Sequence, residues 1–106
     1  MGHYLIEATY TTQGLQGLMK EGAASRVGAV TKLIESVGGR IECAYWAFGD
    51  RDYIAVVELP DNAAAAALAL TVAGSGAVGL KTTVLLTAAE VDDARGRRVT
   101  YRAPGA

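Results

Sequence analysis

Arg26 is the side chain of this sequence best suited to hold an anion, and it falls where a helix buries its apolar residues. At about 100° per residue, the helix predicted for this region places Arg26 in the middle of the apolar arc, beside Leu33 and Met19. A buried guanidinium must be paired, because leaving it unsatisfied costs several kcal/mol. Its planar fork of donors suits the carboxylate, phosphate or enolate of a bound molecule.

Two explanations of this charge are open from the sequence. In the first, Arg26 forms an internal ion pair that ties the helix to the sheet. Five carboxylates are available for such a pair: Glu7, Glu42, Asp50, Asp52 and Glu58. In the second, a bound molecule supplies the negative charge, and Asp52 orients the arginine or moves a proton. Gly22, one turn earlier in KEGAASR (20–26), suggests that something needs space, because glycine costs a helix about 1 kcal/mol relative to alanine.

Aromatic side chains offer walls for a planar ligand beside this charge. Trp46 lies in the aromatic segment AYWAFGD (44–50), and Tyr4 and Tyr10 lie in the first predicted strand. Together with Lys20, at the edge of the apolar arc, they are our candidate ligand-binding residues, in addition to Gly22. The competing interpretation is ordinary packing, because aromatic residues favour strands.

Other site chemistries have little support. His3 is the only histidine and Cys43 the only cysteine, so a histidine metal cluster, a Ser-His-Asp triad and an intramolecular disulfide are not expected. The glycines of GSGAVGLKT (74–82) precede a predicted strand and do not open a helix, which is the wrong context for a phosphate-binding loop. We therefore expect no metal and no cofactor.

The composition describes one globular domain. The chain has 106 residues, of which 51% are hydrophobic and 20% charged, with a formal net charge of −1. Near-neutral charge argues against a nucleic-acid partner, and no apolar run is long enough to predict a membrane span. A cytoplasmic protein is the expectation. The segment 95–106, with four arginines, is predicted to be a basic tail outside the domain.

The order of predicted elements gives the fold class. Four segments have the β-branched and aromatic residues typical of strands: 3–10, 40–48, 53–59 and 78–86. Three have helical spacing or helix-capping residues: a long helix capped by Thr12 and ending at Val37, a helix in 61–76, and a short one that follows Thr87.

This β-α-β-β-α-β order predicts an α+β, ferredoxin-like domain, with two helices on one face of a four-stranded antiparallel sheet and a short C-terminal helix. Both faces of the predicted strands are largely apolar, as Val56 and Val57 show by pointing to opposite sides. One chain has helices for only one face. A partner chain is the simplest cover for the other, so we predict a homo-oligomer, at least a dimer.

Several short motifs in order resemble the GYD domain family, over about residues 3–94. They are KEG-x-x-x-R (20–26), ESVGGRIE (35–42), YWAFGDRD (45–52), ELPDNAAAAALAL (58–70) and GLKTT (79–83). The family takes its name from a Gly-Tyr-Asp signature at the hairpin. Gly49 and Asp52 match it, whereas Arg51 stands where the tyrosine is expected and Tyr53 lies close by as a partial substitute.

The resemblance implies a place in the dimeric α/β barrel superfamily, whose sheets pair across chains. GYD domain proteins are small bacterial proteins, largely of unknown function. The superfamily includes cofactor-free monooxygenases, lactone isomerases, haem-binding peroxidases and stress-response proteins, often with pockets between sheet and helices. Our first hypothesis is therefore a small-molecule-binding protein, with oxygenase or isomerase chemistry on a planar anionic compound held by Arg26. The alternative is a non-catalytic assembly or regulatory module in which Arg26 is a structural ion pair.

Overall fold

The structure, a computed structural model, describes residues 1–106 and has four strands and four helices. The strands are β1 (Gly2–Tyr10), β2 (Arg40–Trp46), β3 (Tyr53–Leu59) and β4 (Val78–Leu85). The helices are α1 (Thr12–Glu21), α2 (Ala23–Ser36), α3 (Asn62–Gly74) and α4 (Ala88–Gly96). The predicted order of elements is confirmed, except that the first helix is two helices.

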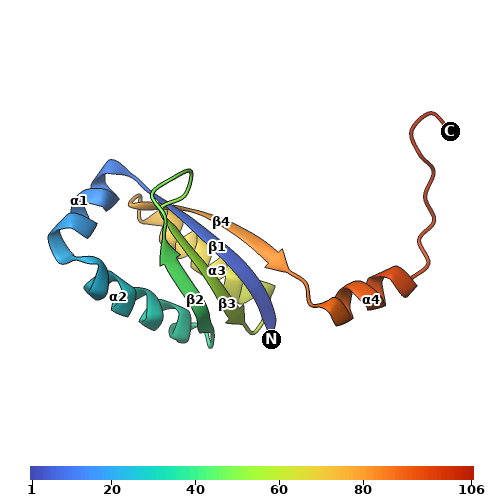
Figure 1. The fold of residues 1–106 in the computed structure, drawn as a ribbon, viewed down its shortest axis with the longest axis horizontal. Helices are drawn as coiled ribbons and strands as arrows, with labels where there is room; N and C mark the ends of the chain where they lie inside the picture. Colours follow the sequence, from blue (N-terminus) through green and yellow to red (C-terminus); the bar gives the residue numbers. More distant parts are fainter.

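The sheet has the ferredoxin-like strand order β2-β3-β1-β4, and every neighbouring pair is antiparallel. Alternate residues of the central strands β1 and β3 are buried, and Leu59 is fully so, at 0% exposed. Ile34 of α2 and Leu68 of α3 belong to the same core cluster, so both helices cover one face of the sheet (Figure 1). None of the helices combines the length and apolarity that a membrane span requires.

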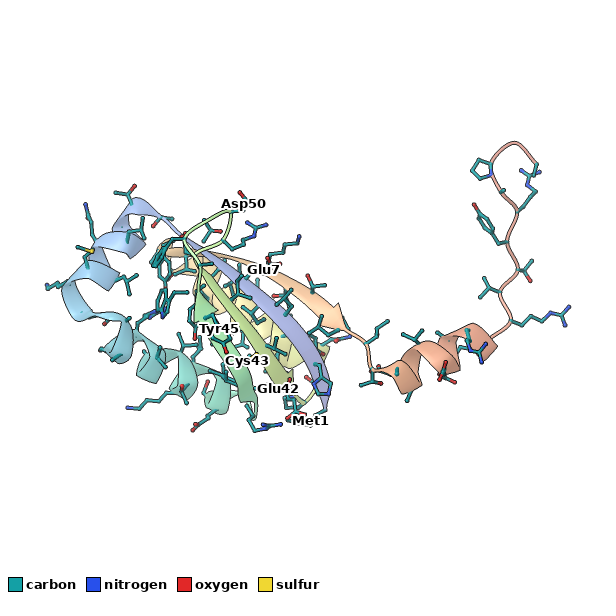
Figure 2. The ribbon with its side chains drawn as sticks, in the orientation of Figure 1. Met1, Glu7, Glu42, Cys43, Tyr45 and Asp50 are labelled. Carbon is teal, nitrogen blue, oxygen red and sulfur yellow. The ribbon has the colours of Figure 1, made fainter.

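The opposite face, which we call the open face, has no cover within the chain. The intervening residues Leu5, Ile54 and Val56 of the central strands are only half-buried, and Tyr45 on β2 is 72% exposed. Figure 2 looks onto this face, with Tyr45 in front of β2 and α3 behind the sheet. The sequence prediction that a single chain covers only one face is confirmed.

The predicted long helix is wrong, because the chain breaks at Gly22. This residue ends α1 and begins α2 with φ 86° and ψ 159°, a conformation that is essentially restricted to glycine. A Cβ at Gly22 would meet nothing within 4 Å, so the glycine is needed for its backbone conformation and not for space. The break turns α1 away from the sheet, and Met19, expected beside Arg26, is 86% exposed.

Two other boundaries differ from the sequence prediction. The cap of α1 is Thr11, whose side chain accepts a hydrogen bond from the Gly14 N–H, and not Thr12. The strand β2 ends at Trp46, because the chain turns at Phe48, which has a positive φ of 56°. The predicted capping box at Thr87 is confirmed. It begins α4, which extends away from the sheet together with the basic tail and is exposed throughout (Figure 1).

We predict that Gly22→Ala lowers the free energy of unfolding by about 1–3 kcal/mol, because alanine must be forced into this backbone conformation. Gly28→Ala is the matched control, since Gly28 lies inside α2 with open space around it and should gain up to about 1 kcal/mol. Urea denaturation of both variants measures the two effects. Equal stability of Gly22→Ala and wild type would contradict the imposed break.

Candidate functional site

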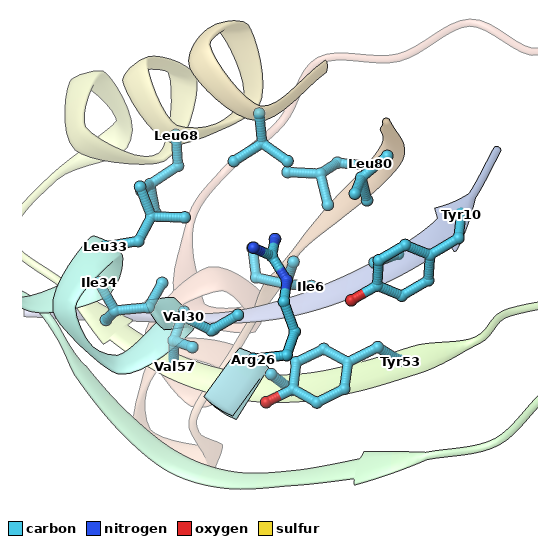
Figure 3. Close-up of a pocket in the computed structure, with 14 residues that line it drawn as sticks. Ile6, Tyr10, Arg26, Val30, Leu33, Ile34, Tyr53, Val57, Leu68 and Leu80 are labelled. Atoms are coloured by element: carbon cyan, nitrogen blue, oxygen red, sulfur yellow. The ribbon is translucent and has the colours of Figure 1, made fainter. Parts of the chain in front are cut away.

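Arg26 lies in a cavity between the sheet and its covering helices. The cavity has a volume of about 50 Å³, and 13 of the 14 residues that line it are hydrophobic; Arg26 is the exception. The strands contribute Ile6 and Tyr53, and α2 contributes Val30 and Leu33 around the arginine (Figure 3). This volume holds a few water molecules or one small polar group.

A wider cleft of about 560 Å³ adjoins this inner cavity. It is lined by α1, the C-terminal end of α3 and the start of β4, and it includes Lys20 and Glu21. The two spaces share Tyr10, Arg26 and two valines, so the arginine stands where the outer cleft meets the inner cavity. The break at Gly22 contributes to the cleft, because it separates α1 from the sheet.

No carboxylate of the chain pairs with Arg26. The six ion pairs of the structure join other residues, and the Nε of Arg26 is buried without any hydrogen-bond partner. The contact expected with Asp52 is not formed. Asp52 instead accepts a hydrogen bond from the backbone N–H of Tyr10 at 2.8 Å, because its loop closes against the end of β1. The structure therefore lacks the internal pair that the assembly hypothesis requires.

A stack of aromatic rings supports the cavity on the β2 side. The centroid of Trp46 lies 4.7 Å from that of Tyr53 and 5.9 Å from that of Tyr10, and Phe48 stacks on the outside at 5.9 Å. Trp46 itself does not line the cavity. It fixes the two tyrosines that do, so its position differs from the predicted contact with a ligand.

Tyr53 is a pocket residue that the sequence pattern did not predict. This tyrosine is 5% exposed, lines the cavity, and has a hydroxyl without a hydrogen-bond partner. Burial raises its pKa above the ordinary value of 10.0, and Tyr10 contributes in the same direction, while the positive charge of Arg26 opposes them. Tyr53 is therefore a neutral donor at physiological pH. The sequence feature that could have indicated Tyr53 is its position directly after Asp52 of the family's hairpin signature.

The remaining predicted residues divide between the site and the rest of the fold. Lys20 lines the outer cleft. Gly22 shapes the backbone between α1 and α2 and lines neither space. Tyr4 lies at the far end of β1 from Tyr10, where its hydroxyl donates to Oδ1 of Asn62 at 2.6 Å, so it belongs to the core and not to the site.

A separate cluster on the open face has metal-ligand side chains. The ring of His3 lies between Glu42 and Glu58, with Nδ1 2.8 Å from Oε1 of Glu42 and Nε2 3.8 Å from Oε1 of Glu58. The bulge between Ile41 and Cys43 accommodates Glu42. Arg40 already pairs with Glu58, and its positive charge opposes a cation there. The hydrogen bonds and ion pairs within the cluster account for its arrangement.

Comparison with known protein families places most of the chain in one of them. The GYD domain matches residues 4–94 of the chain. The chain therefore belongs to the GYD domain family, as its motifs predicted. No curated protein and no solved structure matches it. Arg51, at the position of the signature tyrosine, does not line the cavity, and its Nε lies 3.8 Å from Oε2 of Glu7.

Tyr53 should make the stability of the protein fall at alkaline pH. Because the folded protein binds the phenolic proton more tightly than the unfolded chain does, this contribution is complete below pH about 10 and is lost as pH rises through the elevated pKa. Tyr53→Phe should lack this loss, so its stability should fall less steeply above pH about 10. Tyr45→Phe, at an exposed position, is the control and should keep the wild-type slope. Urea denaturation across this range measures the slopes, and identical slopes in all three proteins would contradict the burial effect.

Proposed function

We propose that this protein binds a small planar organic anion, with the charged group at Arg26 and the body of the molecule in the outer cleft. The observation that carries the proposal is the unpaired guanidinium in a cavity whose other lining residues are hydrophobic. Arg26 is half-buried and its Nε has no hydrogen-bond partner, which costs the empty protein stability, whereas an anion would satisfy the group. The cleft volume of about 560 Å³ lies in the range of small-molecule sites.

The charge of Arg26 would also support chemistry on the bound molecule. A fixed guanidinium in an apolar surrounding stabilises an enolate, which is the kind of charge that cofactor-free oxygenases and isomerases develop on their substrates. Asp52 lines neither the cavity nor the cleft, so it supports Tyr10 and does not move a proton of the ligand. Any proton exchange at the ligand falls to the hydroxyls of Tyr10 and Tyr53. Cys43 is an exposed free thiol, which fits the reducing cytoplasmic setting that we include in the proposal.

We also propose that two copies associate through their open faces. Leu5, Ile54 and Val56 form the apolar centre of this face. Around them the charges balance, with three of each sign: Glu7, Glu42, Glu58, Arg40, Arg51 and Lys81. A two-fold contact brings the same surface onto itself, and a face without net charge avoids repulsion between the copies. The dimer would leave the Arg26 cavity on the opposite side of each sheet.

Arg26→Met should raise the stability of the ligand-free protein and abolish binding of planar aromatic carboxylates such as benzoate and cinnamate. Removal of the unsatisfied buried group should add about 1–3 kcal/mol to the free energy of unfolding. Calorimetric titration measures binding, and urea denaturation measures stability. Native mass spectrometry of protein purified from its own cells identifies the natural ligand.

Lys32→Met is the control for this substitution, because Lys32 lies on the exposed face of the same helix. It should retain binding and change stability by less than about 0.5 kcal/mol. Loss of stability in Arg26→Met, with no carboxylate bound by wild type, would favour the structural role of the arginine and overturn the proposed function.

Val56→Asp should convert the dimer into monomers while the Arg26 cavity keeps its affinity for benzoate. Each copy would bury an unpaired carboxylate at the centre of the contact, which should weaken association about 100-fold or more. Light scattering coupled to size exclusion measures the mass. Leu70→Asp, at an exposed position of α3, is the control and should remain dimeric. A monomeric wild type, or a dimeric Val56→Asp, would contradict the open-face interface.

A further inference from the structure

Two buried side-chain polar atoms in the whole chain have no hydrogen-bond partner: the Nε of Arg26 and the hydroxyl oxygen of Tyr53. Both residues line the same inner cavity. They come from different elements, α2 and β3, which pack against each other through the core. Buried polar groups are otherwise satisfied in native proteins, so two orphans in one small cavity indicate a common missing partner.

The chemistry of the two orphans defines that partner. Arginine has only donors, and a neutral tyrosine hydroxyl has one proton to donate. The two groups do not bond to each other, and a hydrophobic lining surrounds them. Figure 3 shows Arg26 between Tyr10 and Tyr53, with the Tyr10 hydroxyl turned toward the guanidinium and the Tyr53 hydroxyl beside the first part of the arginine side chain. Both groups that lack a partner are donors in the same cavity, so the cavity needs an acceptor-rich group.

We infer that the inner cavity is a head-group pocket for a single carboxylate, with one carboxylate oxygen accepting from Arg26 and the other from the hydroxyl of Tyr53. A carboxylate is planar, has only acceptors, and offers two oxygens in a fixed geometry. The volume of about 50 Å³ fits such a group, whereas the ring that carries it remains in the outer cleft. A tetrahedral head group has a third oxygen, which would lie against the hydrophobic lining without a donor. Tyr53 thus determines specificity for the head group.

This inference rests on the proposed function, because it specifies what Arg26 binds. The test uses the full-length protein and three probes that share a benzene ring but differ in head group: benzoate, benzenesulfonate and phenylphosphonate. Calorimetric titration gives the three affinities for wild type, Tyr53→Phe and Tyr45→Phe. Tyr45 is the matched control, since it lies exposed on the open face.

Wild type should prefer benzoate to the two tetrahedral probes. Tyr53→Phe should lose about tenfold or more in benzoate affinity, as expected for a hydrogen bond to a charged acceptor, and Tyr45→Phe should lose nothing. Only the affinity for benzoate should fall in Tyr53→Phe, so the ratio of this affinity to the affinities for the two tetrahedral probes should also fall. A merely structural role for Tyr53 would lower the affinity for all three probes alike.

The failures of the two proposals are distinguishable. Benzoate binding that survives in Tyr53→Phe, or a wild type that binds phenylphosphonate as well as benzoate, would overturn the head-group pocket and leave the proposed function standing, provided that Arg26→Met still abolishes binding. Binding of no probe, together with a stability loss in Arg26→Met, would overturn both. If only water occupies the pocket, none of the three probes binds, and both proposals are overturned.

Discussion

The unpaired guanidinium of Arg26 is the constraint on which the rest of this structure depends. A charge that is partly removed from water, among hydrophobic neighbours, must be compensated by something. The chain has eleven acidic residues and brings none of them into an ion pair with this arginine. The aromatic stack, the tyrosine hydroxyls and the adjoining cleft surround this group, and under the proposed function a ligand supplies the compensating charge.

The backbone break at Gly22 is what makes the arginine accessible. In one continuous helix, the residues before Arg26 would continue along the sheet and close the end of the cavity. With Gly22 at φ 86°, α2 still packs on the sheet while α1 diverges, and the space between them becomes part of the outer cleft. Thr11 anchors the other end of α1, since its hydroxyl and its N–H both donate to the carbonyl of Ala77. The cleft is therefore held open at two points.

Sequence patterns predicted most of the fold because the strands and caps depend on local chemistry. The alternation along β1 and β3, the cap of α3 by Asp61 and the capping box at Thr87 are each determined by neighbouring residues. The break at Gly22 was not predicted, because the apolar residues on either side of this glycine have the same spacing whether the helix continues or turns. Arg26 was identified correctly as lying on the covered side of α2, since that half of the pattern is regular.

The site could be predicted only in part, because its contacts join residues that are distant in sequence. Asp52 is a plausible partner for Arg26 by charge, yet the hairpin loop fixes its carboxylate on the Tyr10 N–H. Tyr53 meets Arg26 because the register of β3 beside β1 turns its ring toward α2. The orphaned state of both groups is a property of the folded chain that no local pattern contains. A family signature at a hairpin indicated the right region, and the packing of α2 over β3 decided which of its residues faces the charge.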